Sequence, residues 1–359
     1  MKYRLLGSTN LSVSEIGFGT IPILQGNIPV LPEYYNLTQD EALHLLNYAF
    51  LLGCNLFDTA IVPEYGDAEI KLGKFAAMID RNRFIISDKA RCFTGNEMYQ
   101  AVLTSCENLG CTPDLYFVHQ VDETSEDTVF SQYGALDALT ELKKEGKLRF
   151  VGIASHYYDI LLRAAFDVRV DVLQGSGNLL ERGMLERIQL EPAFRQKGIL
   201  VNKVYAAGIL PSFFSEDILI SSVLSYPISC ALIGFGTKEQ FDLAVHAEEI
   251  SGVKLPSFEQ VIGKLEKYFH PIPCDRCQRC HCPFGTEIHT LFRQYNYYHL
   301  GKNYWALRKL DLGIRESANY CRNCISMTCM KQCPRNLRIP DYIQQIESLV
   351  AIHVHNSRI

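Results

Sequence analysis

Short apolar or β-branched runs recur along the first 250 residues, at intervals of roughly 20 to 40 positions. They predict eight strands, at residues 14–20, 55–60, 84–90, 115–121, 150–155, 170–176, 198–206 and 230–236. The segments between them have helical spacing. In residues 40–52, for example, Leu43, Leu46 and Phe50 recur on one face of a predicted helix. Further helices are predicted at 101–109, 136–144, 238–247 and 258–268.

The alternation of strands with helices predicts parallel β-α-β units, which place the chain in the α/β class. Eight such units in 250 residues favour a closed (β/α)8 TIM barrel over an open doubly wound sheet. An open dinucleotide-binding sheet would carry G-x-G-x-x-G after its first strand, and the GFGT segment at 17–20 does not supply it. We therefore predict a TIM barrel.

The overall composition is that of a globular protein, with 47% hydrophobic and 21% charged residues. No apolar stretch reaches the roughly 18 residues of a membrane helix, and the first ten residues lack the apolar core of a secretory signal. These features predict a cytoplasmic protein with no membrane partner.

The cysteines divide the chain. Eight of the thirteen lie between Cys274 and Cys333, and a dense block in a large intracellular chain indicates a metal site rather than disulfides. Prolines 271 and 273 precede the block, so we predict a barrel over 1–265 and a smaller, mainly helical domain over 266–359. The segment from Tyr268 onward contains 12 Lys or Arg residues and 6 Asp or Glu residues. This positive balance would offset metal-bound thiolates, and we predict no nucleic-acid partner.

Polar residues follow three consecutive strands of the predicted barrel. Asp58, Lys89 and His119 lie near the ends of their strands, and Tyr65 lies in the loop after Asp58. Because the active sites of TIM barrels lie at the carboxyl ends of the strands, these four side chains are expected to meet at one rim.

The first 250 residues resemble the aldo/keto reductase family. The resemblance is carried by YRLLGSTNLSVSEIGFGT at the start, GCNLFDTAIVPEYGDAEIKLGKF around Asp58 and Tyr65, NRFIISDKA around Lys89 and DLYFVHQVD around His119. It implies a catalytic tetrad of these four residues and NADPH or NADH as the hydride donor. It also implies a small-molecule carbonyl or alcohol as the substrate.

The residue types suit carbonyl reduction. A tyrosine with a pKa of about 10 is a poor acid–base catalyst near neutral pH. We expect the Lys89 ammonium to lower the pKa of Tyr65, Asp58 to orient Lys89, and His119 to hydrogen-bond the carbonyl oxygen.

The resemblance also implies cofactor contacts. Ser155 and Gln174 match positions that hold the nicotinamide carboxamide, His156 stands where the family usually has Asn, and Tyr205 is the candidate stacking ring. The glycines before the last helix suit a pyrophosphate. The candidates there are Gly234, Gly236 and Thr237, with Gln240 near the adenosine and Lys238 near a 2′-phosphate. The choice between NADPH and NADH stays open.

The cysteine block contains two runs, CDRCQRCHCP and CRNCISMTCMKQCP, which both begin C-x₂-C and end C-P. They resemble the ferredoxin-like tail of one aldo/keto reductase branch, which implies two [4Fe–4S] clusters. By this resemblance Cys274, Cys277, Cys280 and Cys333 hold one cluster, and Cys282, Cys321, Cys324 and Cys329 the other. The spacing departs from the ferredoxin pattern at Cys282 and Cys329. Two Cys₄ zinc sites are the alternative, and His281 is an alternative ligand.

Two functions from different classes follow. The first is an NAD(P)H-dependent iron–sulfur oxidoreductase, with a ferredoxin as a further redox partner. The second is a non-enzymatic electron-transfer or zinc-organised interaction protein with an inactive barrel, motivated by the positive tail and by His156. The substrate is left open, because rim loops such as 21–36 vary freely on a barrel.

Overall fold

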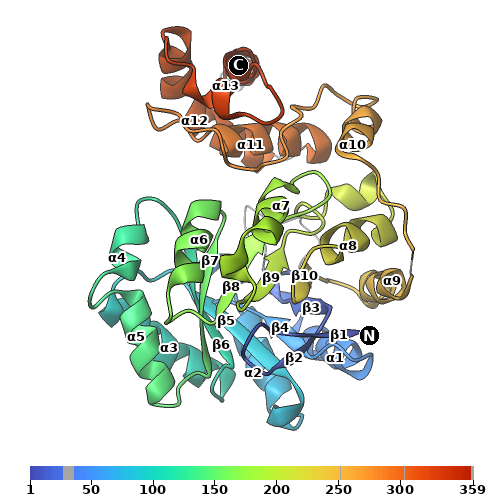
Figure 1. The fold of residues 1–359 in the computed structure, drawn as a ribbon. Coiled ribbons are helices and arrows are strands. Elements are labelled where there is room, and N and C mark those ends of the chain that lie inside the picture. Colours follow the sequence, from blue (N-terminus) through green and yellow to red (C-terminus); the bar gives the residue numbers. More distant parts are fainter. Residues whose placement is uncertain (27–35, 251, 303, 357–359) are drawn as a thin grey trace. The chain divides into compact units, whose positions relative to one another are not determined.

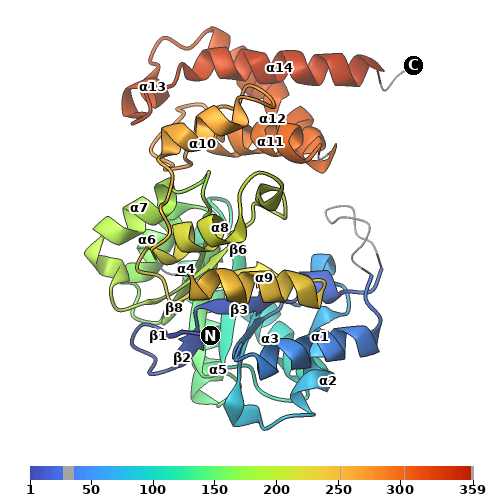
Figure 2. The same cartoon turned by 90° about the vertical axis from the view of Figure 1, so that its right-hand side faces the viewer.

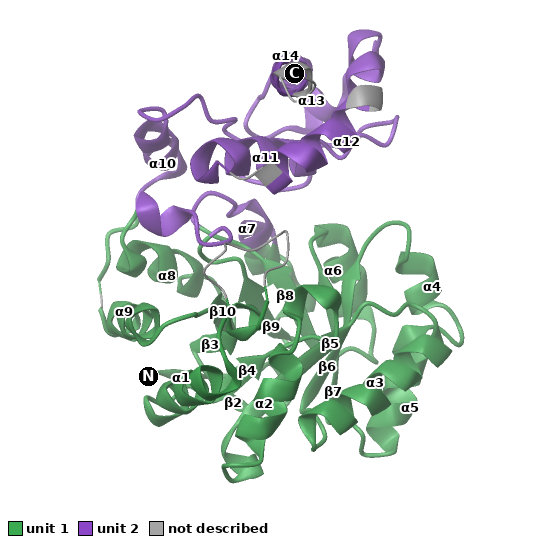
Figure 3. Cartoon of the chain, turned by 180° about the vertical axis from the view of Figure 1, so that it is seen from behind, with its two compact units in different colours: residues 1–178, 188–205, 214–255 green, residues 179–187, 206–213, 256–359 purple. Residues whose placement is uncertain are grey.

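The computed structural model describes residues 1–26, 36–250, 252–302 and 304–356. Most of the predicted substrate loop 21–36 therefore lies outside the described residues. The chain forms two compact units, of which unit 1 holds residues 1–178, 188–205 and 214–255, and unit 2 holds residues 179–187, 206–213 and 256–359 (Figure 3). Across the described residues, no helix combines the length and hydropathy that a transmembrane span requires.

Unit 1 contains a closed barrel of eight parallel strands (Figure 1). The strands are β3 (Ile16–Gly19), β4 (Leu56–Asp58), β5 (Ile85–Ala90), β6 (Leu115–Val121), β7 (Phe150–Ser155), β8 (Val172–Ser176), β9 (Gly198–Asn202) and β10 (Cys230–Gly234). They pair in chain order, and β10 closes the ring on β3. All eight predicted strands and the predicted barrel are confirmed, with differences of a few residues at the strand ends.

Helices that connect successive strands lie outside the barrel (Figures 1 and 2). They are α1 (Gln39–Leu51), α2 (Ala68–Ala76), α3 (Gly95–Leu109), α4 (Glu126–Phe130), α5 (Ala135–Lys144), α6 (Tyr158–Phe166) and α8 (Glu216–Leu224). Helix α9 (Lys238–Glu249) follows the last strand, and α7 (Gly183–Leu190) follows β8 in the chain and begins in unit 2. Capping boxes start α1 at Thr38 and α3 at Thr94. The predicted inner face of α1 is partly wrong. Leu43 is only half-buried, and Ala42 and Ala49 lie with Leu46 and Phe50 in the core.

An N-terminal hairpin covers one end of the barrel. Strands β1 (Tyr3–Leu5) and β2 (Ser12–Ser14) pair antiparallel, and Leu6 and Val13 beside them are fully buried. These two residues share a core cluster with Leu115 and Val172, which are the first residues of β6 and β8. The hairpin therefore fills the amino-terminal end of the barrel and leaves the carboxyl-terminal end for a site.

Unit 2 is helical over its described residues, which contain no strand. Its helices are α10 (Phe258–Leu265), α11 (Ile288–Gly301), α12 (Tyr304–Arg322), α13 (Thr328–Gln332) and α14 (Ile339–Asn356). Phe292, Leu310 and Ile343 are buried in its apolar core, and five half-buried cysteines pack against that core. The predicted domain division at 265/266 falls after α10, whereas unit 2 includes α10. The ferredoxin-like character of this unit remains a prediction.

Candidate active site and candidate metal centres

Three of the predicted catalytic residues lie in contact at the carboxyl ends of neighbouring strands. Asp58 is the last residue of β4 and Lys89 the second-to-last of β5. The Nζ atom of Lys89 lies 2.6 Å from Oδ2 of Asp58 and donates a second bond of 2.6 Å to the carbonyl of Thr59. The same Nζ lies 5.3 Å from the ring centroid of Tyr65, which ends a short 3₁₀ helix. Lys89 is fully buried, so its charge is matched by Asp58 and not by water.

The second carboxylate oxygen of Asp58 is also fully engaged. Its Oδ1 atom accepts from Ser87 Oγ at 2.6 Å and from Gln174 Nε2 at 3.2 Å. Ser87 was not among the predicted site residues, although it precedes Lys89 by two positions on β5 and therefore shares its side of the strand. The Asp58 carboxylate is thus held at both oxygens.

The buried charges shift the pKa values of this group. Burial alone would lower the pKa of Lys89, but the Asp58 carboxylate and Tyr65 outweigh burial, and the pKa is raised. The pKa of Tyr65 is also raised, because loss of water around the phenol outweighs the Lys89 ammonium. The expected net lowering of the Tyr65 pKa is therefore wrong. Lys89 acts in the expected direction, but burial is the stronger effect.

His119 lies on a distorted part of β6. The pairing of β6 with β7 shifts between Val118 and Val121, and Gln120 takes a left-handed φ of 55°. Burial and then the charge of Lys89 hold the pKa of His119 well below its usual value. Its Nδ1 atom has no hydrogen-bond partner among the described residues. The imidazole is therefore neutral and keeps one ring nitrogen for a ligand.

The predicted carboxamide contacts follow β7 and β8. Ser155 Oγ donates to the carbonyl of Val121 at 2.6 Å, and His156 follows it half-buried. The amide nitrogen of Gln174 is bound to Asp58, while its buried Oε1 has no partner in the described part of the chain. Gln174 therefore keeps one free acceptor.

The predicted stacking ring lies in a strained turn after β9. Lys203, Ala206 and Ala207 take φ angles of 60°, 49° and 58°, a left-handed region that non-glycine residues rarely occupy. Burial raises the pKa of Tyr205, whose hydroxyl lacks a partner among the described residues. The Oδ1 atom of Asn202 is likewise buried and unpartnered. Asn202 was not among the predicted site residues.

The five residues predicted to bind the pyrophosphate and adenosine lie together where β10 meets α9: Gly234, Gly236, Thr237, Lys238 and Gln240. Gly236 N–H donates to Gln240 Oε1 at 2.8 Å, and Thr237 Oγ1 accepts from Gln240 N–H at 3.3 Å as the cap of α9. The ammonium of Lys238 lies 5.1 Å from the ring centroid of Tyr48. The Gly236 N–H is thus used inside the protein and becomes available to a phosphate only when the Gln240 side chain moves.

The comparison with known families agrees with this geometry. The family model described as "Aldo/keto reductase family" matches residues 15–215. This chain belongs to the aldo/keto reductase family.

Named members are moderately similar to the chain. It is 32% identical over 171 residues to L-galactose dehydrogenase of Arabidopsis thaliana, covering 45% of this chain and 50% of that protein. It is 25% identical over 242 residues to the NADH-specific methylglyoxal reductase of Escherichia coli K12, covering 60% of this chain and 71% of that protein. The chain spans about half the length of the first of these relatives.

The fold is also shared with solved aldo/keto reductases. The holo form of an aldo-keto reductase from Bacillus halodurans aligns with a TM-score of 0.59 at 19% identity, covering 77% of this chain and all of that one. A likeness at this identity shows the barrel fold. The aldo/keto reductase family match ends at residue 215, so the eight clustered cysteines lie beyond it.

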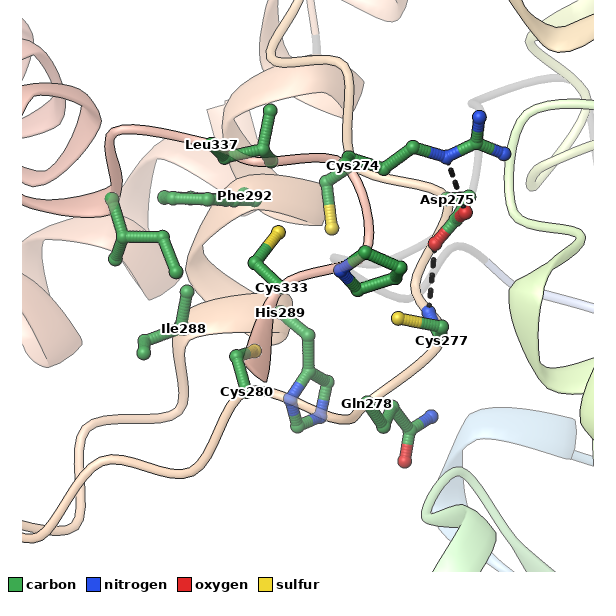
Figure 4. A pocket seen from close by; sticks show the side chains of 13 residues that line it. Cys274, Asp275, Cys277, Gln278, Cys280, Ile288, His289, Phe292, Cys333 and Leu337 are labelled. Carbon is green, nitrogen blue, oxygen red and sulfur yellow. Dashed lines mark hydrogen bonds and ion pairs between the residues drawn. The ribbon is translucent and has the colours of Figure 1, made fainter. Parts of the chain in front are cut away.

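The clustered cysteines surround two cavities within unit 2. The first is lined by Cys274, Cys277, Cys280 and Cys333, together with apolar residues such as Phe292 and Leu337 (Figure 4). The second is lined by Cys282, Cys321, Cys324 and Cys329, together with Phe284 and Met327. Each encloses about 340 Å³ of empty space, including space open to solvent. These are the two cysteine sets that the sequence analysis assigned to two clusters.

The donors around the first cavity suit a thiolate-bound group. Burial raises the pKa of Cys277 to about 11 and that of Cys280 to about 12, so burial alone would keep both thiols protonated, and a bound metal would have to outweigh this effect. Arg276 and Gln278, which flank Cys277, take left-handed φ angles of 61° and 57°. Left-handed residues beside right-handed ones are typical of the anion-binding backbone concavities found at many iron–sulfur sites.

His281, the predicted alternative ligand, lies outside both cavities. It is exposed, and its N–H donates to Gln332 Oε1 at 3.0 Å. Within the described ranges, no three His, Cys, Asp or Glu side chains are arranged to hold a single metal ion.

Proposed function

We propose that the protein is an NAD(P)H-dependent oxidoreductase that reduces the carbonyl group of a small molecule, or oxidises the corresponding alcohol. The 2.6 Å contact between buried Lys89 and Asp58, beside Tyr65, is the observation that carries this proposal. The names of the relatives, a methylglyoxal reductase and an L-galactose dehydrogenase, are consistent with carbonyl and alcohol substrates.

The cofactor residues suit a nicotinamide. The buried acceptor atoms Gln174 Oε1 and Asn202 Oδ1 lack partners among the described residues, and the amide N–H₂ of a carboxamide offers two donors. Tyr205 supplies a ring, with Ser155 and His156 at the end of β7. Thr237, Lys238 and the glycines around them are assigned to the phosphates, as in the sequence analysis. When bound, NAD(P)H supplies the hydride.

The protein's own residues supply the proton. Tyr65 donates its phenolic proton to the carbonyl oxygen, and the Lys89 ammonium stabilises the phenolate that remains. Asp58 keeps Lys89 charged and in place, and Ser87 and Gln174 fix the carboxylate. Neutral His119 hydrogen-bonds the substrate oxygen and orients it.

Replacement of the proton donor tests this proposal. Tyr65→Phe removes the hydroxyl but keeps the ring, and we expect kcat to fall by roughly 10²- to 10⁴-fold. The affinity for the cofactor should stay nearly unchanged, because Tyr65 acts on the transition state. Tyr99→Phe is the matched control, since it removes the hydroxyl of a tyrosine on α3 that bonds to Glu145 and is not assigned to the site. Unchanged turnover by Tyr65→Phe would overturn the assignment.

We propose further that unit 2 holds two [4Fe–4S] clusters, one in each cysteine-lined cavity. When bound, such clusters supply one-electron transfer. The second cavity lies near the surface of unit 2, because Ile325 beside Cys324 is 97% exposed and Met327 is 42% exposed. This side is where we place electron exchange with a ferredoxin.

Metal analysis tests the second proposal. Anaerobically purified protein should contain eight irons and eight acid-labile sulfides per chain, since eight cysteines provide four thiolates for each cubane. It should be brown and should bleach on reduction. Colourless, zinc-loaded protein would overturn the cluster assignment and leave the barrel proposal intact.

A further inference from the structure

A buried group of three charged side chains lies beside the first cysteine cavity. Glu181, Arg276 and Arg293 are 3%, 4% and 7% exposed. The Oε2 atom of Glu181 lies 3.5 Å from Arg276 Nη1, and its Oε1 atom lies 3.2 Å from Arg293 Nε. One carboxylate therefore holds two guanidinium groups, one at each oxygen. We call these residues the charged triad.

The triad adjoins the proposed ligands of the first cluster. Arg276 stands in the sequence between Cys274 and Cys277, which both line the first cavity. His289 lines the same cavity, and burial together with the charges of Arg276 and Arg293 lowers its pKa to about 3. The positive charge of the two arginines therefore reaches the cavity wall, where the imidazole is neutral.

The triad contains two guanidinium groups and one carboxylate, so the formal charges of its three side chains sum to +1. A second charged group at this cavity joins Arg335 to Asp275 at 2.7 Å and to Glu259 at 3.2 Å. A cubane held by four thiolates is negatively charged and becomes more negative on reduction. The two arginines of the triad therefore carry the charge opposite to that of the group proposed for the cavity, whereas Glu181 carries a charge of the same sign.

Among the residues that the structure describes, the lining of the second cavity includes no charged side chain. Its lining residues are four cysteines and five uncharged residues: Pro283, Phe284, Ile288, Met327 and Pro340. The two proposed clusters thus share the same ligand type and differ in the charges around them.

The carboxylate of the triad is fixed by its backbone. Glu181 belongs to residues 179–187, which follow β8 in the chain but belong to unit 2. The N–H of Gly183 donates to the carbonyl of Asp275 at 2.8 Å. A Cβ atom on Gly183 would lie 2.6 Å from the backbone nitrogen of Cys277, so only glycine permits this approach. Arg187 Nη1 donates to the carbonyl of Cys277 at 2.9 Å. These contacts hold Glu181 at a set distance from the cysteine loop.

We propose that the charged triad sets the reduction potential of the first cluster, with Arg276 and Arg293 raising it and Glu181 limiting the rise. The inference rests on the proposed function, because it requires the cluster to be present. The cluster would be reduced by one electron from a reduced ferredoxin, which would be oxidised in turn, with no bond broken and no proton moved. The added negative charge is stabilised by the two guanidinium groups and opposed by the carboxylate.

The test is a potentiometric titration of the anaerobic holoprotein with dithionite, followed by electron paramagnetic resonance. Glu181→Gln should raise the midpoint potential of the first cluster, and Arg276→Gln should lower it. Each change should shift the reduction equilibrium at least tenfold, which is about 59 mV for one electron. The second cluster should keep its potential. Signals are assigned with Cys329→Ala, which retains only the first cluster.

Opposite shifts from the two partners of one ion pair separate charge from structure. A purely structural role would move both variants in the same direction or leave both unchanged, and either result would overturn the inference. Arg276→Lys keeps the charge and should shift the potential less than Arg276→Gln. If Arg276→Gln does not retain iron, Arg293→Gln on α11 lies outside the cysteine runs and should lower the potential.

Iron and sulfide analysis separates failure of the proposed cluster binding from failure of the inference about the charged triad. Wild-type protein without iron or sulfide would overturn the proposed function and the inference with it. Protein with full iron and sulfide whose potentials do not respond to these substitutions would overturn the inference alone.

Discussion

The side-chain amide of Gln174 donates to Oδ1 of Asp58 over 3.2 Å and joins β8 to β4 inside the barrel. Asp58 holds Lys89 through its other oxygen, and Gln174 keeps a buried acceptor for a ligand. One residue therefore connects the proposed nicotinamide contact with the proposed proton-transfer group. Binding of the cofactor and orientation of the ion pair are expected to depend on each other.

Replacing Gln174 by leucine should affect both steps. The variant loses the bond to Asp58 and the free acceptor, so the Kd for the cofactor should rise by about tenfold or more, in line with the ~1–3 kcal/mol cost of a buried unpaired polar group. The kcat should also fall. Fluorescence titration and steady-state kinetics measure the two effects. Gln100→Leu, at an exposed position of α3, is the control. A Kd equal to that of the wild type would contradict the assignment.

Asp58→Asn should weaken both activity and folding. Asparagine keeps the shape but leaves the buried Lys89 charge uncompensated, and breaking a buried pair costs about 3–5 kcal/mol. Urea unfolding measures the loss in the free energy of unfolding. Glu141→Gln is the control, because Glu141 pairs with Lys144 at 2.8 Å and both side chains are more than half exposed. The control should lose about 1 kcal/mol or less. Equal losses in the two variants would argue against a special role for the Asp58–Lys89 pair.

The pH dependence should follow the raised pKa of Tyr65 and the lowered pKa of His119. Reduction needs the protonated phenol, which is present below its pKa, so the reduction rate should be level from about pH 6 to 9 and fall only above about 10. Oxidation needs the phenolate, so its rate should rise about tenfold per pH unit in the same range. His119 is already neutral there and adds no acid limb. A midpoint near pH 7 in the reduction profile would show that another group limits the rate.

The two cysteine runs should exchange one ligand each. Cys282 belongs to the first run but lines the second cavity, and Cys333 belongs to the second run but lines the first. Cys282→Ser should therefore remove the same paramagnetic signal as Cys324→Ser, whereas Cys333→Ser should remove the same signal as Cys280→Ser. Cys111→Ser, outside the block, is the control. If Cys280→Ser and Cys282→Ser removed the same paramagnetic signal, the exchange of ligands between the two runs would be contradicted.

The barrel could be predicted because its evidence is local. Each strand is a short apolar run, and α1 and α3 begin at recognisable capping residues. The buried face of α1 was harder to predict from the sequence. Small alanines at 42 and 49 fill it, and spacing of large side chains alone gave too much weight to Leu43. Which residues of an amphipathic helix are covered depends on neighbours that are distant in the sequence.

Parts of the site were beyond the reach of sequence. Spacing on β5 contained a signal for Ser87, which stands two positions before Lys89 and points to the same side. Asn202, at the end of β9, had the same positional signal as the predicted residues. The net pKa shift of Tyr65 could not be read from residue types, because it depends on how much water surrounds the ring. The contact of Glu181 with Arg276 joins positions 95 residues apart and follows only from the fold.

The cysteine unit is assembled from three separate stretches of chain. A fragment starting at Pro256 would carry all eight clustered cysteines but would lack Glu181, the counter-charge of two buried arginines, and Gly183, whose backbone supports the cysteine loop. In such a fragment, the two arginines would have to be exposed to water or find other partners, and the cysteine loop would lose its backbone contact. The tail is therefore not a transferable module. In evolution, recombination at the apparent boundary would separate it from part of its own interior, so the barrel and the tail are expected to be inherited together.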